Sequence, residues 1–141
     1  MSAVTLLCAD RPLPLYGSGL RRMEIRSQGG DTVRTETEGF AVRALDYYRP
    51  AVEALGLDLK PCPYELNLCA TEEDAAALRA YLERNCAPGE AVELWRLWVG
   101  VDREARVPCF RGKLSGLDAE TLEQLAPPRI ALWQCRLTIE I

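Results

Sequence analysis

The chain has 141 residues, with 21 acidic and 17 basic side chains, a net charge of −4 and no histidine. This length predicts one domain, residues 1–141, with a hydrophobic core of its own. The acidic surplus argues against nucleic-acid binding, because neutralising phosphates requires clustered Lys and Arg. The absence of histidine excludes Ser-His-Asp and Cys-His nucleophiles and histidine-ligated metal ions.

The N-terminal segment lacks the basic and apolar regions of a secretory signal, and no apolar run approaches the ~18 residues that cross a bilayer. We therefore expect a cytoplasmic protein with no membrane partner. Its cysteines are then expected to be free thiols. None has Cys-x-x-Cys spacing, so we predict no metal site and no cofactor. The six cysteines are Cys8, Cys62, Cys69, Cys86, Cys109 and Cys135.

Two strands are predicted near the N-terminus. Residues 3–9 are apolar and partly β-branched, and two prolines, Pro12 and Pro14, end this strand. Residues 20–27 alternate apolar and charged side chains, which is typical of a half-exposed strand.

A helix is predicted next. The Thr-x-x-Glu spacing at residues 35–38 resembles a capping box, and apolar side chains recur at helical spacing up to Gly56. Pro50 falls inside this segment and predicts a kink or a split of the helix.

The middle of the chain predicts a strand, a helix and a strand over residues 64–99. Residues 64–70 alternate, Thr71 begins a helix that runs to about Cys86, and residues 91–99 carry apolar side chains on both faces. Such a βαβ unit should have parallel strands joined by a right-handed crossover.

The C-terminal third predicts a weak strand at residues 107–114 and a short helix at residues 118–125. Residues 131–141 alternate cleanly, as expected of a strand packed on one side and lying near a sheet edge. We therefore expect the strand at residues 130–141 to mediate self-association, as in a homodimer, or contact with a protein partner.

Together these elements predict an α/β fold, at the border with α+β. The expected domain has a mixed sheet of about five or six strands, one parallel βαβ unit at about residues 64–99, two main helices and a short third helix.

Sites in open sheets gather at the carboxyl ends of parallel strands. Here Cys69, Asn67 and Asp102 follow or end the strands of the βαβ unit. Cys69 also precedes a helix N-terminus, which can lower a thiol pKa, although the acidic first turn of the helix opposes this effect. The thiol is either the nucleophile of a small thiol-dependent enzyme or sensor, or a buried and inert core residue.

Thr71 at the same strand end and Trp98 in the next strand are candidate binding residues. Trp95 and Trp98 are an odd number of residues apart, so one of them is expected to face a groove or a partner. Because no catalytic motif is recognisable, the leading hypothesis is a non-catalytic interaction or accessory protein, and the alternative is the Cys69 enzyme or sensor.

Four short motifs, at residues 10–14, 81–82, 89–94 and 98–100, together resemble those of a family of small bacterial proteins with no established activity. Members open with a strand followed by Asp-(Lys/Arg)-Pro-Leu-Pro, here residues 10–14, and later carry a Tyr-Leu pair that ends a helix, here residues 81–82. A Gly-Glu-x-Val-Glu-Leu strand and a Trp-x-Gly end follow, here residues 89–94 and 98–100. The family's Cys-Gly-Cys-Gly segment is absent, so its thiol or metal role is not carried over.

Overall fold

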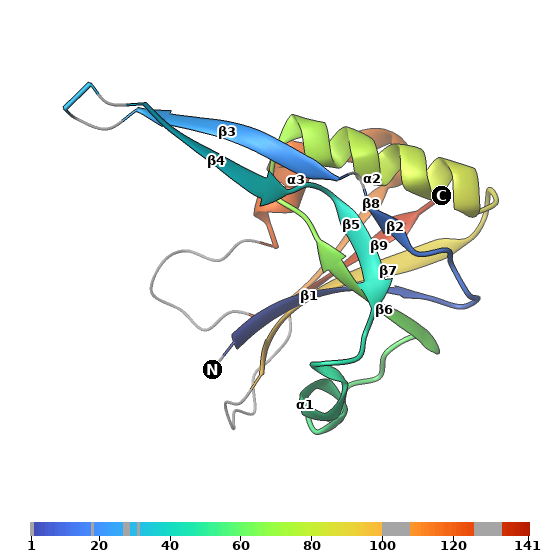
Figure 1. The fold of residues 1–141 in the computed structure, drawn as a ribbon. Helices are drawn as coiled ribbons and strands as arrows, with labels where there is room; N and C mark the ends of the chain where they lie inside the picture. The colour runs from blue at the N-terminus through green and yellow to red at the C-terminus, as the bar shows by residue number, and fades with distance from the viewer. Residues whose placement is uncertain (1, 18, 27–28, 31, 100–107, 126–133) are drawn as a thin grey trace.

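The computed structural model describes residues 2–17, 19–26, 29–30, 32–99, 108–125 and 134–141. Seven strands form one sheet in the order β2-β5-β6-β1-β7-β9-β8, and β3 and β4 form a separate hairpin that projects from the sheet (Figure 1). The strands are β1 (Ser2–Ala9), β2 (Tyr16–Gly17), β3 (Leu20–Arg26), β4 (Thr32–Glu38), β5 (Ala41–Ala44), β6 (Cys62–Asn67), β7 (Ala91–Val99), β8 (Cys109–Lys113) and β9 (Cys135–Glu140). The helices are α1 (Arg49–Glu53), α2 (Glu72–Asn85), the 3-10 turn η1 (Leu114–Gly116) and α3 (Ala119–Glu123).

The sheet is mixed, and the fold is α+β. Among the described residues, five of the six neighbouring strand pairs are antiparallel, and only β8 and β9 run parallel side by side. The expected mixed sheet is therefore confirmed, but it has seven strands instead of five or six. The additional strands include the two-residue β2, which is too short to leave a periodic signal in the sequence.

The two strands of the predicted βαβ unit run in the same direction but are not neighbours. β1 pairs antiparallel with β6 on one side and with β7 on the other, so β6 and β7 are parallel to each other across it. β1 suits this interior place because both of its faces are buried, with Leu7 on one face and Leu6 on the other. The crossover through α2 therefore spans three strands of the sheet.

The predicted helix over residues 35–56 is wrong over most of its length. Residues 32–38 form β4, which pairs with β3, and residues 41–44 form β5. Only α1 is helical, and Pro50 lies in its first turn instead of interrupting it. The first turn needs no amide donor from proline, so Pro50 begins this helix. The Thr-rich segment at residues 32–38 alternates as a strand does, and pairing with β3 determines its conformation.

Helix α2 agrees with the prediction. Thr71 is its N-cap, and the Thr71 hydroxyl accepts a hydrogen bond from the amide of Asp74 at 3.2 Å. The apolar side of the helix packs on the sheet through Leu78 and Leu82, both with no exposed surface. Within the described residues, no helix has both the length and the apolar character required to cross a membrane.

The C-terminal strand lies near an edge of the sheet, as predicted, but it is not the edge strand itself. β9 pairs antiparallel with β7 and parallel with β8, and β8 forms that edge of the sheet. Over residues 135–140 both sides of the strand are already paired, so this stretch has no open backbone edge for a second copy of the chain. Residues 130–133 of the proposed contact lie outside the described residues.

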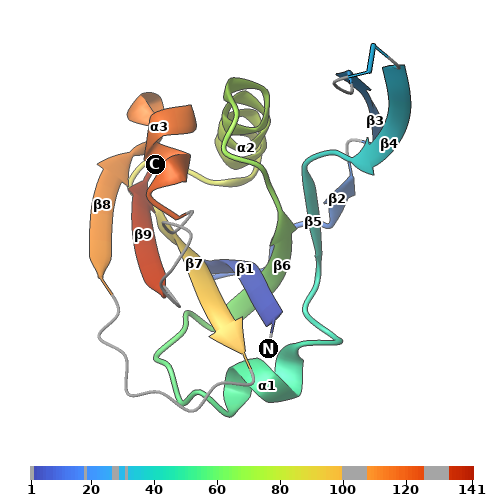
Figure 2. The same cartoon turned by 90° about the vertical axis from the view of Figure 1, so that its left-hand side faces the viewer.

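Helices cover both faces of the sheet (Figure 2). On one face, α2 and α3 pack on a cluster that includes Leu94 and Leu137. On the other face, α1 packs through Val52 on a smaller cluster that includes Trp95 and Leu97. Alternate residues of β7 therefore belong to different clusters, which is why this strand is apolar on both faces.

The segment at residues 10–14, which follows β1, is hydrogen-bonded to the C-terminal part of α2 and to Glu90. Both oxygens of the Glu90 carboxylate accept hydrogen bonds from Arg11, at 2.7 and 2.8 Å, and Arg11 also donates to the carbonyl of Asn85 at 2.6 Å. Tyr81 donates to the carbonyl of Pro14 at 2.6 Å. The motifs on which the family resemblance rests therefore contact one another, and this gives them a structural role.

The Arg11–Glu90 pair predicts an acid-sensitive stability. The hydrogen bonds from Arg11, followed by the Ala87 amide, lower the pKa of the Glu90 carboxyl from 4.5 to about 2. A lowered pKa contributes stability above the unfolded value, so this contribution should disappear as the pH falls from 4.5 to about 2. Glu90→Gln and Arg11→Met should each remove it. Urea denaturation between pH 2 and 7 measures the effect, and a wild-type-to-variant difference that does not change with pH would contradict it.

Candidate functional site

A cavity of about 310 Å³ lies beside the carboxyl end of β6. Thr5 of β1 and Arg96 of β7 contribute to it from the sheet, and the segment at residues 68–70 and the α3 region contribute the other described lining residues. The side chains that line the cavity are Thr5, Leu68, Cys69, Ala70, Arg96, Leu122 and Leu125.

Of the lining residues that the structure describes, Arg96 alone is positively charged. Val92 and Leu94 of β7 face α2, and the alternation of the strand places Arg96 on the same face. The Arg96 Nη1 atom donates to the Thr5 hydroxyl, at 3.0 Å, across the β1–β7 pair. The Nε atom of Arg96 is buried and has no hydrogen-bond partner.

The charge of Arg96 has no carboxylate partner among the described residues. Burial lowers the pKa of the guanidinium below its usual value, and the nearby Cys135 opposes this effect. Arginine nevertheless remains protonated at neutral pH. In the part of the chain that the structure describes, no Asp or Glu forms an ion pair with Arg96. The hydrogen bond that the structure does describe for this half-buried cation goes to a neutral hydroxyl, that of Thr5.

Arg136 provides a useful contrast on the opposite face of the sheet. It is also half-buried, and its Nε atom is also buried without a partner. Its guanidinium, however, lies over the Trp95 ring, 5.5 Å from the ring centroid, and this cation–π contact stabilises the charge. Arg136 does not line the cavity.

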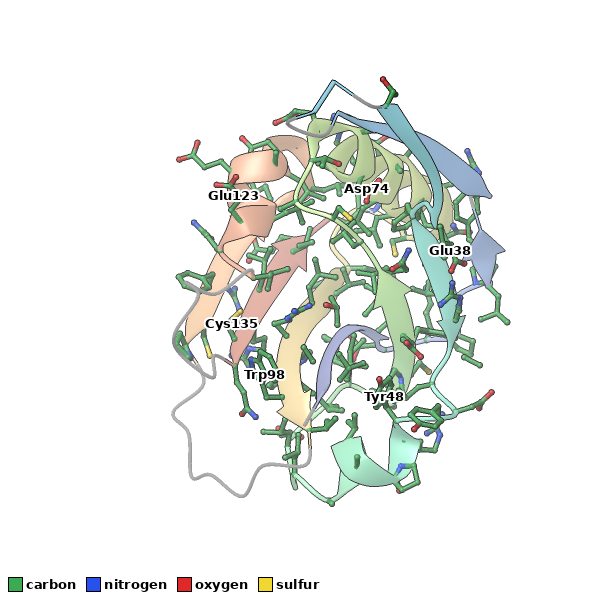
Figure 3. All side chains as sticks on the ribbon, turned by 60° about the vertical axis from the view of Figure 1, so that its left-hand side comes forward. Glu38, Tyr48, Asp74, Trp98, Glu123 and Cys135 are labelled. Atoms are coloured by element: carbon green, nitrogen blue, oxygen red, sulfur yellow. The ribbon has the colours of Figure 1, made fainter. Side chains whose placement is uncertain are left out.

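Cys69 lies in the cavity wall, where the sequence predicted a site. Its side chain is exposed, so the interpretation as a buried core thiol is wrong. Its backbone amide donates to the carboxylate of Asp74 at 2.7 Å. Asp74 is 1% exposed and sits in the first turn of α2 (Figure 3). Helix α2 thereby fixes the segment that carries the thiol.

The predicted partners of Cys69 do not join it in the described structure. The Asn67 side chain donates to the carbonyls of Glu38 and Gly39, at 3.2 and 2.7 Å, and so connects β6 to the start of β5. Asn67 does not line the cavity. Asp102 lies outside the described residues.

The two candidate binding residues have different roles. Thr71 acts as the N-cap of α2. Trp98 lies on the same face of β7 as Arg96, two residues further along, and near Cys135 of β9 (Figure 3). Trp98 is half-buried, its indole Nε1 is buried without a partner, and its carbonyl accepts a hydrogen bond from Gln134. Neither residue lines the cavity.

Arg96 is the residue that sequence reasoning missed. The sequence does carry a signal for it, because Arg96 is the only basic side chain in the apolar stretch at residues 91–99. An arginine in an interior strand needs compensation, and its presence there indicates either an internal ion pair or a ligand.

Comparison with known proteins gives no relative. Neither family models, nor curated proteins, nor solved structures contain a match to this chain.

Proposed function

We propose that this chain is a non-catalytic binding protein of a bacterial cytosol, and that its cavity binds a small anion through Arg96. The observation that carries the proposal is the half-buried guanidinium that no described carboxylate compensates. The cytosolic setting is supported by the six cysteines, all described and none of them in a disulfide bond. The resemblance to a family of small bacterial proteins supports a bacterial source.

An anion in the cavity would provide a charged partner for Arg96. Burying a charge without a partner costs free energy, and folding of the chain has already buried the Arg96 guanidinium before any ligand binds. A carboxylate that enters the cavity therefore gains a charge-assisted hydrogen bond without having to bury the cation itself. Hydrogen bonds to charged groups contribute about 1.5–3 kcal/mol, which corresponds to about 10- to 150-fold in affinity.

The proposal predicts the effect of Arg96→Met on the binding of butyrate. This change keeps a long side chain and removes the charge, so the dissociation constant should rise about 10- to 150-fold. Titrations followed by ¹H–¹⁵N NMR spectra measure the constants.

Arg136→Met is the matched control. It removes the other half-buried arginine, which lies on the opposite face of the sheet over Trp95, and should leave the affinity for butyrate unchanged. Equal weakening by both variants would indicate a general charge effect and would contradict the proposal, as would the binding of neither butyrate nor phosphate to the wild type.

A second candidate function is supported by one observation, the exposed Cys69 thiol in the same cavity as Arg96. A thiol enzyme or sensor would use this cysteine as its nucleophile, with the substrate anion held at Arg96. The nucleophile would have to react as a thiolate, and its reactivity would exceed that of other exposed thiols.

Alkylation of the six thiols, measured residue by residue by mass spectrometry, separates the two functions. Burial raises the pKa of Cys8 to about 12, so Cys8 should be modified most slowly. Cys109 is an exposed thiol that does not line the cavity and is the matched control. The binding function predicts similar rates for Cys69 and Cys109. A Cys69 rate more than tenfold above that of Cys109, and reduced in Arg96→Met, would favour the thiol function.

A further inference from the structure

The lining of the cavity restricts the anion that it can hold. Apart from Arg96, the polar groups among the described lining residues are the Thr5 hydroxyl and the Cys69 thiol. The Thr5 hydroxyl already accepts from Arg96. The other lining residues are apolar, namely Leu68, Ala70, Leu122 and Leu125. We infer, on the basis of the proposed function, that the ligand is a monocarboxylate with a short aliphatic chain.

A single cation matches a single negative charge. Phosphate and nucleotide sites use several donors, commonly the free amides of a helix N-terminus. Here the N-terminus of α2 is capped by its own side chain, since Thr71 accepts from the Asp74 amide. The first turn of α2 also carries Glu72 and Glu73, which repel further negative charge. Among the described lining residues, a phosphate group would therefore have Arg96 as its charged donor and no set of free helix amides beside it.

The apolar walls match a hydrocarbon chain. Leu122 and Leu125 are buried at the α3 side of the cavity, and Leu68 and Ala70 lie on the opposite wall. A ligand whose carboxylate contacts Arg96 places its chain between these walls. The volume of about 310 Å³ is near the lower end of the range of ligand pockets, about 300–1,000 Å³, which indicates a short chain.

The test compares straight-chain carboxylates from acetate to hexanoate with inorganic phosphate, each titrated into the wild-type chain and into Arg96→Met. Each added methylene should strengthen binding roughly fourfold, as expected for the burial of one CH₂ group, until the chain fills the cavity. Phosphate should bind more weakly than butyrate.

The outcomes separate the two proposals. Equal affinities across the carboxylates, or phosphate binding as tight as that of butyrate, would overturn the monocarboxylate inference, while sensitivity to Arg96→Met would still support an anion site. Binding of no anion, or binding that Arg96→Met does not change, would overturn both.

A second variant tests the walls directly. Ala70→Leu adds bulk to the loop wall of the cavity and should weaken hexanoate at least tenfold more than acetate. Circular dichroism checks that the variant is folded. A variant that weakens all chain lengths equally would contradict a chain lying between these walls, and the wild-type series decides the inference even if this variant does not fold.

Discussion

Leu94→Ala should lower the free energy of unfolding by about 2–5 kcal/mol, the usual range for truncating a buried leucine. Leu94 lies on the interior strand β7, has no exposed surface, and belongs to the larger core cluster under α2. The substitution removes apolar contacts and leaves a cavity that the paired neighbours β1 and β9 cannot fill without moving. Urea denaturation followed by circular dichroism measures the change.

Leu15→Ala is the matched control for this prediction. The same atoms are removed from a side chain that is 61% exposed, so the free energy of unfolding should change by less than about 0.5 kcal/mol. A small effect of Leu94→Ala, close to that of Leu15→Ala, would mean that β7 is not interior and would contradict the strand order.

Asp74→Ala should lower the free energy of unfolding by roughly 1–3 kcal/mol and should also weaken anion binding. The Asp74 carboxylate is buried and accepts from the Cys69 amide, so its removal leaves this amide without its acceptor and loosens the wall of the cavity at residues 68–70. Denaturation and butyrate titration measure the two effects on the same preparation.

Asp74→Asn separates the effect of the hydrogen bond to the Cys69 amide from the effect of the negative charge of Asp74. Its amide oxygen still accepts from the Cys69 amide, so stability and binding should both lie closer to the wild type than in Asp74→Ala. If the two variants lost binding equally, the geometry of the segment at residues 68–70 would not control the site.

Sequence patterns correctly predict the elements whose structure is determined by residues close in the sequence. α2 carries its own cap at Thr71 and an apolar face at helical spacing, and β7 is apolar on both sides. Local patterns failed where distant pairing determined the structure. Residues 35–38 satisfy both a capping box and a strand, and only the pairing of β4 with β3 distinguishes them.

The order of strands had the same limitation. β1 inserts between β6 and β7, which the sequence places side by side, and the antiparallel registers on both sides of β1 come from contacts across more than fifty residues. The alternation of the final strand correctly predicts a place near a sheet edge, but it does not predict that β8 pairs with the outer side of this strand. A pattern of exposure on one face carries no information about pairing at the edge.

The rule that sites lie at the carboxyl ends of parallel strands located the candidate site in the sequence, but it did not identify Arg96. Placement at the carboxyl ends of parallel strands identified Cys69, which does line the cavity. Arg96 was missed because its role depends on facing the cavity and on having no carboxylate nearby among the described residues. Both are properties of the folded chain.

Binding of an anion beside Arg96 can be located by an isotope-filtered NOE experiment on ¹³C-labelled protein with unlabelled butyrate. If the anion binds beside Arg96, the protons of butyrate should give NOEs to the methyl groups of Leu68, Leu122 and Leu125, which line the cavity. NOEs to Val52 and Leu55 on the α1 face instead, or no NOEs at a butyrate concentration that saturates the amide shifts, would contradict the account.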